Sequence, residues 1–157
     1  MAPLHHTSGS QWLLLCKNGN ILGVRAALAS LAWPRNDYLN HTDRDYTTGL
    51  MIAVRKGHNT IVKALLEHPS VDLNYANLGG FSALHHAVAA DNLEAVQLLL
   101  ADYRLNIANH QNNLGTTPAM LAMRRNSLDT LRELVAHPSV DLDTKDRWGS
   151  GLEEVAR

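Results

Sequence analysis

The chain is poor in the residues that cross-link a protein or hold it in a membrane. Its 157 residues include one cysteine, Cys16, which excludes an internal disulfide and any zinc site built from several cysteines. Its apolar runs, such as Trp12–Cys16, are far shorter than the roughly 20 residues that a bilayer-spanning helix needs. The first residues also lack the basic start and apolar stretch of a signal peptide. We therefore expect an intracellular protein, cytoplasmic or nuclear, without a membrane span.

An excess of charge and the usual catalytic motifs are missing as well. Fourteen Lys and Arg residues oppose fifteen Asp and Glu, so the net charge of −1 gives no general attraction to nucleic acid or anionic membranes. The sequence contains no Gly-x-Gly-x-x-Gly loop, no His-Glu-x-x-His pair and no Cys-x-x-Cys pair. Nine histidines are present, but none has the spacing of a metal site. We expect a chain that is not an enzyme and uses no cofactor or metal.

What the sequence has instead is internal repetition. Similar stretches begin at Thr48, Ser82 and Thr117, and a fourth one opens at Gly149 shortly before the last residue. A fainter copy precedes them, from Lys17 to Leu28. The aligned alanines of the four clear copies lie 34, 35 and 34 residues apart: Ala53, Ala87, Ala122 and Ala156.

Each copy is typical of a turn followed by two short helices. Thr48, Ser82 and Thr117 are good N-cap residues for a first helix, because a hydroxyl oxygen accepts an unpaired N–H of the first turn. Four residues that tolerate the left-handed conformation follow the first helices: Gly19, Gly57, Asp91 and Asn126. The second helices carry apolar residues at helical spacing. One such unit exposes too much apolar surface to be stable alone, so we expect the units to stack.

These residues resemble the ankyrin repeats, whose unit opens with Thr-Pro-Leu-His-x-Ala and closes its first helix with Gly-His. Thr117–Pro118, Ser82–His85 and Gly57–His58 match this pattern in place, and the resemblance is strong over 44–157 and weak over 8–40. It implies one all-α solenoid domain over 1–157, with four helix-turn-helix repeats and the first helix of a fifth, joined by β-hairpin-like turns. The implied repeats are 8–40, 44–76, 78–111, 113–145 and a partial one at 147–157.

The resemblance also implies a non-catalytic protein-interaction module whose partner lies along a concave groove. The groove residues at the hairpin tips would be Arg44, Asp45, Leu78, Phe81, Leu114, Arg147 and Trp148. Those at the ends of the first helices would be Arg55, Lys56, Arg124 and Arg125. Aromatic residues and arginines are enriched at interface hot spots, so we expect an exposed Phe81 and Trp148 to bind an acidic, partly apolar protein segment. Replacing both Arg55 and Arg124 with Glu should then weaken binding and leave the melting temperature nearly unchanged.

Several alternatives stay open at this point. The chain could be one domain of a longer scaffold or signalling protein, or an inhibitory module that covers a partner's active or targeting surface. Binding of an oligonucleotide by the basic helix ends is less favoured, because the net charge is near zero. Asn74 follows a stretch that resembles the asparagine-hydroxylation sites of ankyrin repeats, although a hydrogen-bonding role in its hairpin also explains it. We expect Cys16 and His85 to be buried structural residues.

Overall fold

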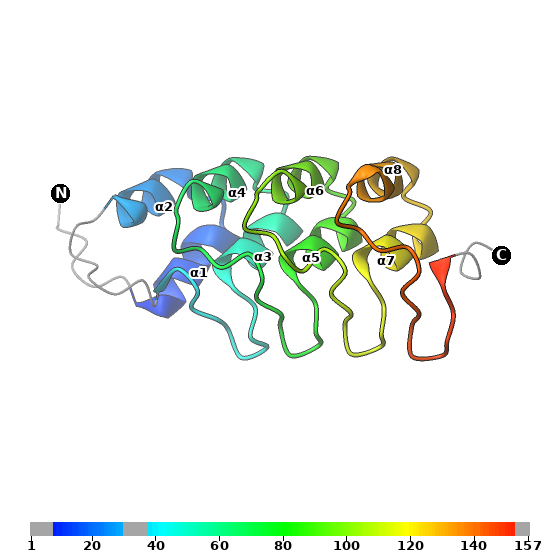
Figure 1. Cartoon of the computed structure of the whole chain (residues 1–157). Helices are drawn as coiled ribbons and strands as arrows, with labels where there is room; N and C mark the ends of the chain where they lie inside the picture. Colours follow the sequence, from blue (N-terminus) through cyan, green and yellow to red (C-terminus); the bar gives the residue numbers. More distant parts are fainter. Residues whose placement is uncertain (1–7, 30–37, 153–157) are drawn as a thin grey trace.

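The computed structural model describes residues 8–29 and 38–152, and this part of the chain forms a row of four helix pairs (Figure 1). The first helix of each pair is called the inner helix and the second the outer helix. The inner helices are α1 (Gly9–Lys17), α3 (Gly49–Arg55), α5 (Ala83–Ala89) and α7 (Pro118–Arg124). The outer helices are α2 (Ile21–Leu28), α4 (Asn59–Leu66), α6 (Leu93–Leu100) and α8 (Leu128–Ala136).

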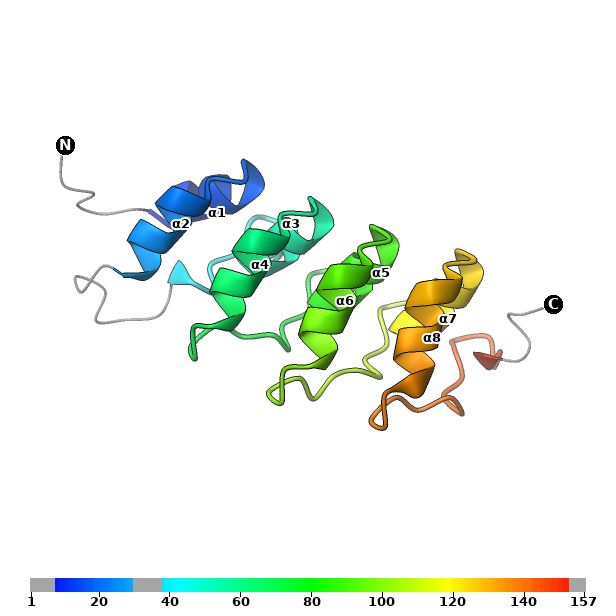
Figure 2. The ribbon, with the colours of Figure 1, turned by 90° about the horizontal axis from the view of Figure 1, so that it is seen from above.

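The pairs stack side by side, so that the molecule has three parallel layers. In Figure 1 the outer helices form the upper layer, the inner helices the middle one, and hairpin loops project below them. Figure 2 shows the same row from above, with each pair beside the next. Each inner helix packs against the following inner helix, and each outer helix against the following outer helix. Within the described ranges the hairpins contain only isolated β-bridges, Thr42 with Thr48 and Ala76 with Ser82.

Local chemistry starts and stops the helices as the sequence predicts. The side chains of Thr48, Ser82 and Thr117 each accept a backbone N–H from the third residue of the helix that follows. Pro118 occupies the first helical position of α7, where no hydrogen bond is lost. The four residues after the inner helices have positive φ angles between 51° and 72°: Gly19, Gly57, Asp91 and Asn126. The predicted helix ends are confirmed.

The core runs continuously through the stack between the two helix layers. Large side chains such as Trp12, Leu65 and Leu99 are fully buried in it. At the α1–α3 contact, Gly49 approaches so closely that an added Cβ atom would lie 2.8 Å from the Trp12 indole nitrogen and 2.9 Å from the Cys16 sulfur. A side chain at this position would therefore separate the first two repeats.

Polar contacts join most of the outer helices to one another. Lys63 on α4 pairs with Glu94 on α6 at 2.6 Å, and Gln97 on α6 donates to Glu133 on α8 at 3.0 Å. Between α2 and α4, the described residues show no hydrogen bond or ion pair that joins the two helices. We call the contact between α2 and α4 the first outer seam, and it therefore depends on apolar packing.

Arg104 makes the most extensive of the contacts between repeats. Its guanidinium is bidentate with Asp102, the shorter distance being 2.6 Å, and it also donates to the Leu66 carbonyl at 2.6 Å and the His68 carbonyl at 3.0 Å. The hydrogen bonds from Arg104 lower the pKa of Asp102, so that its carboxyl stays charged. Arg104 thereby caps the end of α4 from the following repeat.

The all-α repeat architecture is confirmed, and two expectations fall beyond the reach of the structure. Of the expected fifth helix, only Leu152 is described as helical, because the residues after it lie outside the described ranges. Residues 30–37 of the first implied repeat also lie outside them. The repeat and domain boundaries therefore remain predictions. Within the described residues, every helix is too short to cross a bilayer.

Candidate functional site

The four hairpins share one internal hydrogen-bonding pattern. Each begins with an Asp or Asn whose side-chain Oδ1 accepts two backbone N–H groups, two and four residues further along, at 2.8–3.1 Å. The short polar side chain thus replaces a strand partner and closes the turn. The residues in this corner position are Asp43, Asn77, Asn112 and Asp146.

Backbone hydrogen bonds also connect each hairpin to the next one. The N–H of Leu78 donates to the Asp45 carbonyl at 2.9 Å, and the N–H of Asn113 donates to the Gly79 carbonyl at 3.1 Å. The N–H of Arg147 donates to the Leu114 carbonyl at 3.2 Å. The hairpin tips are therefore fixed relative to one another, which makes them a preorganised surface.

Every hairpin tip exposes one large apolar side chain, and we call these four residues the tip row. They are Tyr46, Leu78, Leu114 and Trp148, with 51%, 64%, 47% and 65% of their surface exposed. Three of them were expected at the tips from the sequence, and Tyr46 was missed. The charged residues expected at the tips, Arg44, Asp45 and Arg147, are exposed as well.

Tyr46 stands out because its backbone is strained. Its φ angle is 59°, and the equivalent positions of the other hairpins hold Gly80, Gly115 and Gly149, with φ of 76° to 79°. A bulky side chain in this region is unfavourable by roughly 1–2 kcal/mol relative to a right-handed conformation. The sequence offered one usable signal, a tyrosine where the aligned repeats have glycine. Strain retained at an exposed aromatic residue points to a role at the surface.

The expectation of an exposed Phe81 needs correction. Phe81 is only partly exposed, and its ring packs edge-on against His85 with ring centroids 5.6 Å apart, and beside His86 at 6.0 Å. Its position corresponds to Thr47 and Thr116 of the neighbouring hairpins, which are buried on the inner side of the turn. Phe81 therefore supports the hairpin from beneath instead of forming part of the tip row.

Of the four basic residues expected at the inner-helix ends, three form no ion pair among the described residues. The side chains of Arg55, Lys56 and Arg125 are exposed, and the structure gives them no ion pair among the described residues. We call these three residues the helix-end cations. Arg55 is the last residue of α3 and Lys56 directly follows it, while Arg125 directly follows α7.

Arg124 differs from them, because it belongs to the fold. Its guanidinium donates to the buried Asp146 carboxylate at 2.6 Å and to the Thr116 hydroxyl at 2.9 Å. Burial alone would raise the pKa of Asp146, but the N–H groups of Ser150 and Trp148 and the Arg124 charge together lower it. Arg124 thus helps to keep Asp146 charged. We therefore expect Arg124→Glu to lower stability, and the prediction that replacing both Arg55 and Arg124 with Glu leaves the melting temperature nearly unchanged needs correction.

The histidines in the centre of the stack are structural, as expected for His85. Its Nε2 donates to the Thr116 carbonyl at 2.9 Å, and its Nδ1 lies 2.9 Å from the Ser82 hydroxyl. Burial lowers the pKa of His85 to about 4. Burial and the nearby Arg55 charge also lower the pKa of His86 to about 4, so both rings are neutral near pH 7.

Cys16 has the environment of a buried core residue. It is fully buried, and burial raises the pKa of its thiol to about 12, which keeps it protonated and unreactive. In the part of the chain that the structure describes, no three His, Cys, Asp or Glu residues are grouped closely enough to hold a metal ion.

Asn74 is one member of a hydrogen-bonded series between repeats. Its side-chain Nδ2 donates to the Arg104 carbonyl at 2.8 Å, and its Oδ1 accepts the Asn106 N–H at 3.0 Å. Asn40 and Asn109 make the same pair of bonds to their following repeats. This geometry accounts for Asn74 as a hairpin residue, and its hydroxylation remains a prediction.

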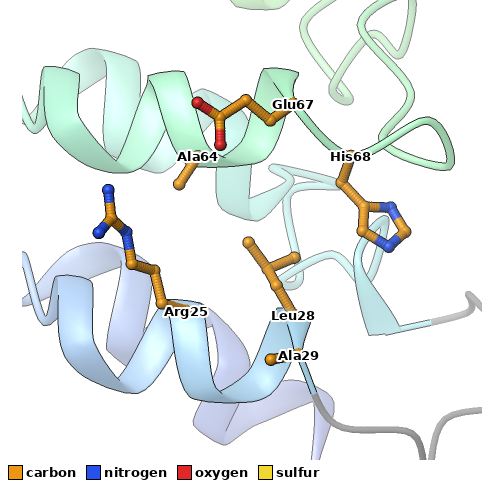
Figure 3. Close-up of a pocket in the computed structure, with 6 residues that line it drawn as sticks. All are labelled: Arg25, Leu28, Ala29, Ala64, Glu67 and His68. Atoms are coloured by element: carbon orange, nitrogen blue, oxygen red, sulfur yellow. The ribbon is translucent and has the colours of Figure 1, made fainter.

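An open groove of about 340 Å³ lies between the outer helices α2 and α4 (Figure 3). Arg25 and Leu28 come from α2, while Ala64 belongs to α4 and Glu67 follows it. Ala29 and His68 complete the lining. The groove lies at the first outer seam, which has no polar contact between the two helices in the described residues.

Comparison with known proteins decides the family. Residues 12–109 match the family description of ankyrin repeats in three copies, which covers more than half of the chain. The chain belongs to the ankyrin-repeat family. Ankyrin repeats generally bind other proteins and are generally not catalytic. The resemblance found in the sequence is thereby confirmed.

Three similar proteins show how widely this repeat occurs. The chain is 29% identical over 135 residues to the putative ankyrin repeat protein YahD of Escherichia coli, which covers 83% of this ankyrin-repeat chain and 64% of YahD. It is 38% identical over 96 residues to human neurogenic locus notch homolog protein 4, covering 61% of the chain and 5% of that protein. It is 41% identical over 64 residues to BTB/POZ domain-containing protein 1 of Schizosaccharomyces pombe, covering 40% of the chain and 5% of that protein. The chain thus spans less than two thirds of each relative.

Proposed function

We propose that this ankyrin-repeat chain is a non-catalytic protein-binding module whose partner docks across the tip row. The observation that carries the proposal is the regular exposure of Tyr46, Leu78, Leu114 and Trp148, one at each consecutive hairpin tip. An aligned set of exposed apolar side chains on a stable protein is typical of an interaction site. The hydrogen bonds within and between the hairpins support the same proposal, because they reduce the ordering that binding requires.

The charges around the tip row favour an acidic partner segment. Arg44 lies in the first hairpin and Arg147 in the last, and the helix-end cations lie on the inner helices behind them. Asp45 is the one acidic residue expected at the tips. We infer a partner segment with apolar residues that contact the tips and acidic residues beside them, since complementary charge raises both specificity and association rate.

We also infer that the module works inside the cell, within a longer scaffold or signalling protein. The single buried cysteine suits a reducing compartment. The small share of the Notch and BTB/POZ relatives that the chain matches supports a module carried in larger proteins. An inhibitory module would use the same binding surface as a scaffold, but it would cover the active or targeting surface of its partner.

The proposal is tested by affinity capture with two matched double variants. Leu78→Ser with Trp148→Ser removes two tip-row side chains. Leu22→Ser with Tyr103→Ser removes two apolar side chains that are 79% and 95% exposed and lie outside the hairpins, on α2 and after α6. A specific partner should be lost from the first variant and retained by the second. Equal capture by both variants would rule out the tip row as the binding surface.

The contribution of the helix-end cations to binding is measured separately on the captured partner. Arg55→Glu with Lys56→Glu should weaken its binding, and the effect should shrink as salt rises, because exposed charges are screened. A single-stranded oligonucleotide serves as the competing probe. Tight oligonucleotide binding that the same two substitutions abolish would favour a nucleic-acid function and contradict the proposal.

A further inference from the structure

Asn18 and Gly19, directly after α1, form the only Asn-Gly pair in the sequence. An asparagine followed by glycine is open to attack on its side-chain amide by the next backbone nitrogen, because glycine has no side chain to block the approach. Gly19 also lies in the left-handed turn that ends the helix, with φ of 70°. Asn18 is exposed and Gly19 is half-buried, and both lie at a helix end, where backbones open most easily.

The Asn18 side chain is exposed, and the structure gives it no hydrogen-bond partner among the described residues. The nearby Asn20 and the equivalent Asn92 of the third helix pair differ in this respect. Asn20 accepts the Gly23 N–H at 2.9 Å, and Asn92 donates to the Val54 carbonyl at 3.1 Å. The Asn18 amide can therefore rotate toward the backbone without breaking a side-chain contact.

The N–H of Gly19 differs from its counterparts in the other repeats. The equivalent N–H groups of Gly57, Asp91 and Asn126 each donate to a carbonyl of the preceding inner helix at 2.9–3.1 Å. For Gly19 the structure gives no such bond within the described residues. An N–H without an acceptor loses its proton to base more readily, which is the step that makes the nitrogen nucleophilic.

We propose that Asn18 is a site of deamidation in this chain. The Gly19 nitrogen gives up its proton to hydroxide and attacks the Asn18 side-chain carbon, forming a new C–N bond. The bond to the amide nitrogen breaks, and ammonia leaves with the proton that it takes from solvent. Water then opens the resulting five-membered imide on either side, giving aspartate or isoaspartate.

The backbone of Asn18 must turn before the reaction, because at its ψ angle of 1° the Gly19 nitrogen is not eclipsed with the Asn18 Cβ atom, as closure of the five-membered ring requires. The hydrogen bond from the Asn20 N–H to the Leu15 carbonyl at 3.0 Å spans the rotating bond and opposes this rotation. Opening of the last turn of α1 is thus the structural step that controls the rate.

The product changes the charge of the proposed binding surface, and this part of the inference rests on the proposed function. Asn18 occupies the position that Lys56 holds in the second repeat, and Lys17 precedes it. A carboxylate here places a negative charge in the series of inner-helix ends that contains the helix-end cations. It should weaken the binding of an acidic partner segment.

The modification is tested on the folded chain by peptide mass spectrometry during incubation at pH 7.4 and pH 9. Conversion of the amide to an acid adds about 1 Da, and an antibody or enzyme assay for isoaspartate confirms the imide route. The gain in mass should be greatest at Asn18 and faster at pH 9. If Asn18 keeps its mass while asparagines elsewhere gain it, the proposal is wrong.

Lys56→Asn provides the matched control, because it creates a second Asn-Gly pair whose glycine N–H donates to the Val54 carbonyl at 3.1 Å. The new asparagine should react severalfold more slowly than Asn18 in the same molecule. Equal rates would contradict the role given to the free Gly19 N–H. The two rates should converge in urea, where both turns are unfolded.

The effect on binding is measured separately with Asn18→Asp. Loss of affinity for the captured partner relative to Asn18→Gln supports the regulatory consequence. If deamidation occurs but Asn18→Asp binds as well as the wild type, the modification stands and its effect on the proposed surface is refuted.

Discussion

At the scale of single residues, the hairpins separate side chains that hold the fold from side chains that face outward. The side chains of the corner residues Asp43, Asn77, Asn112 and Asp146 accept backbone N–H groups and close the turns. The Tyr46 side chain is exposed, and its backbone keeps a conformation that glycine adopts in the other hairpins. Within one loop, a corner residue thus stabilises the fold, whereas Tyr46 costs stability. Substitution of a corner residue should therefore lower stability, and replacement of Tyr46 by glycine should raise it.

Tyr46→Gly should stabilise the chain while weakening partner binding. Relief of the left-handed strain outweighs the extra freedom of glycine in the unfolded chain, for a net gain of about 1 kcal/mol. Urea unfolding measures the gain. Tyr46→Ala is the matched control, since it removes the ring and keeps the strain, so it should weaken binding without raising stability. A Tyr46→Gly variant less stable than Tyr46→Ala would contradict this account.

Arg124→Glu should lower the melting temperature clearly, whereas Arg125→Glu should change it little. The first substitution leaves the buried Asp146 without its cation and places a second carboxylate beside it, and the second alters an exposed side chain. Differential scanning calorimetry of the two single variants provides the comparison. Equal melting temperatures would show that the Arg124–Asp146 pair contributes nothing to the fold.

At the scale of elements, each helix depends on its neighbours more than on its own sequence. The α-helices contain seven to nine residues, which is too short to be stable alone. Arg104 reaches back to cap α4, and His137 lies 3.1 Å from the last carbonyl of α6. The ends of α4 and α6 are therefore completed by the repeat that follows each of them.

Leu99→Ala should destabilise the chain by roughly 2–5 kcal/mol, because its side chain in α6 is fully buried in the central core. Chemical denaturation followed by circular dichroism measures the loss. Leu98→Ala is the control on the same helix, since Leu98 is only partly buried. A loss below about 1 kcal/mol for Leu99→Ala would mean that the core does not use this face of α6.

The sequence predicts the elements well because their signals are local. N-cap residues such as Thr117 and the left-handed residues such as Gly57 act within one turn, so their positions can be assigned from the chain alone. The site is less predictable, because it depends on contacts between repeats. The Arg124–Asp146 pair joins residues of different repeats. The predicted exposure of Phe81 needs correction because its ring packs against His85 and His86, which lie in α5 and not in the hairpin sequence.

At the scale of the whole molecule, two neutral histidines in the core connect stability to pH. The pKa values of His85 and His86 are lowered from 6.5 to about 4 in the folded chain. The unfolded chain therefore binds more protons between these values, and protonation favours unfolding. Their contribution to stability is complete above pH about 6.5 and is lost as the pH falls through about 4.

The free energy of unfolding should therefore fall by up to roughly 3 kcal/mol per histidine between pH 7 and pH 4. Urea unfolding at several pH values measures this slope. His86→Leu should remove about half of it, because one of the two titrating rings is gone. An unchanged slope in His86→Leu would show that other groups cause the acid sensitivity.

The first outer seam, between α2 and α4, has a mechanical consequence. Two of the three outer seams are joined by a polar contact, whereas the first is held, among the described residues, by apolar packing alone. When the stack is pulled along its length, the terminal pair α1–α2 should therefore separate from the row first, while the four hairpins that carry the tip row stay together.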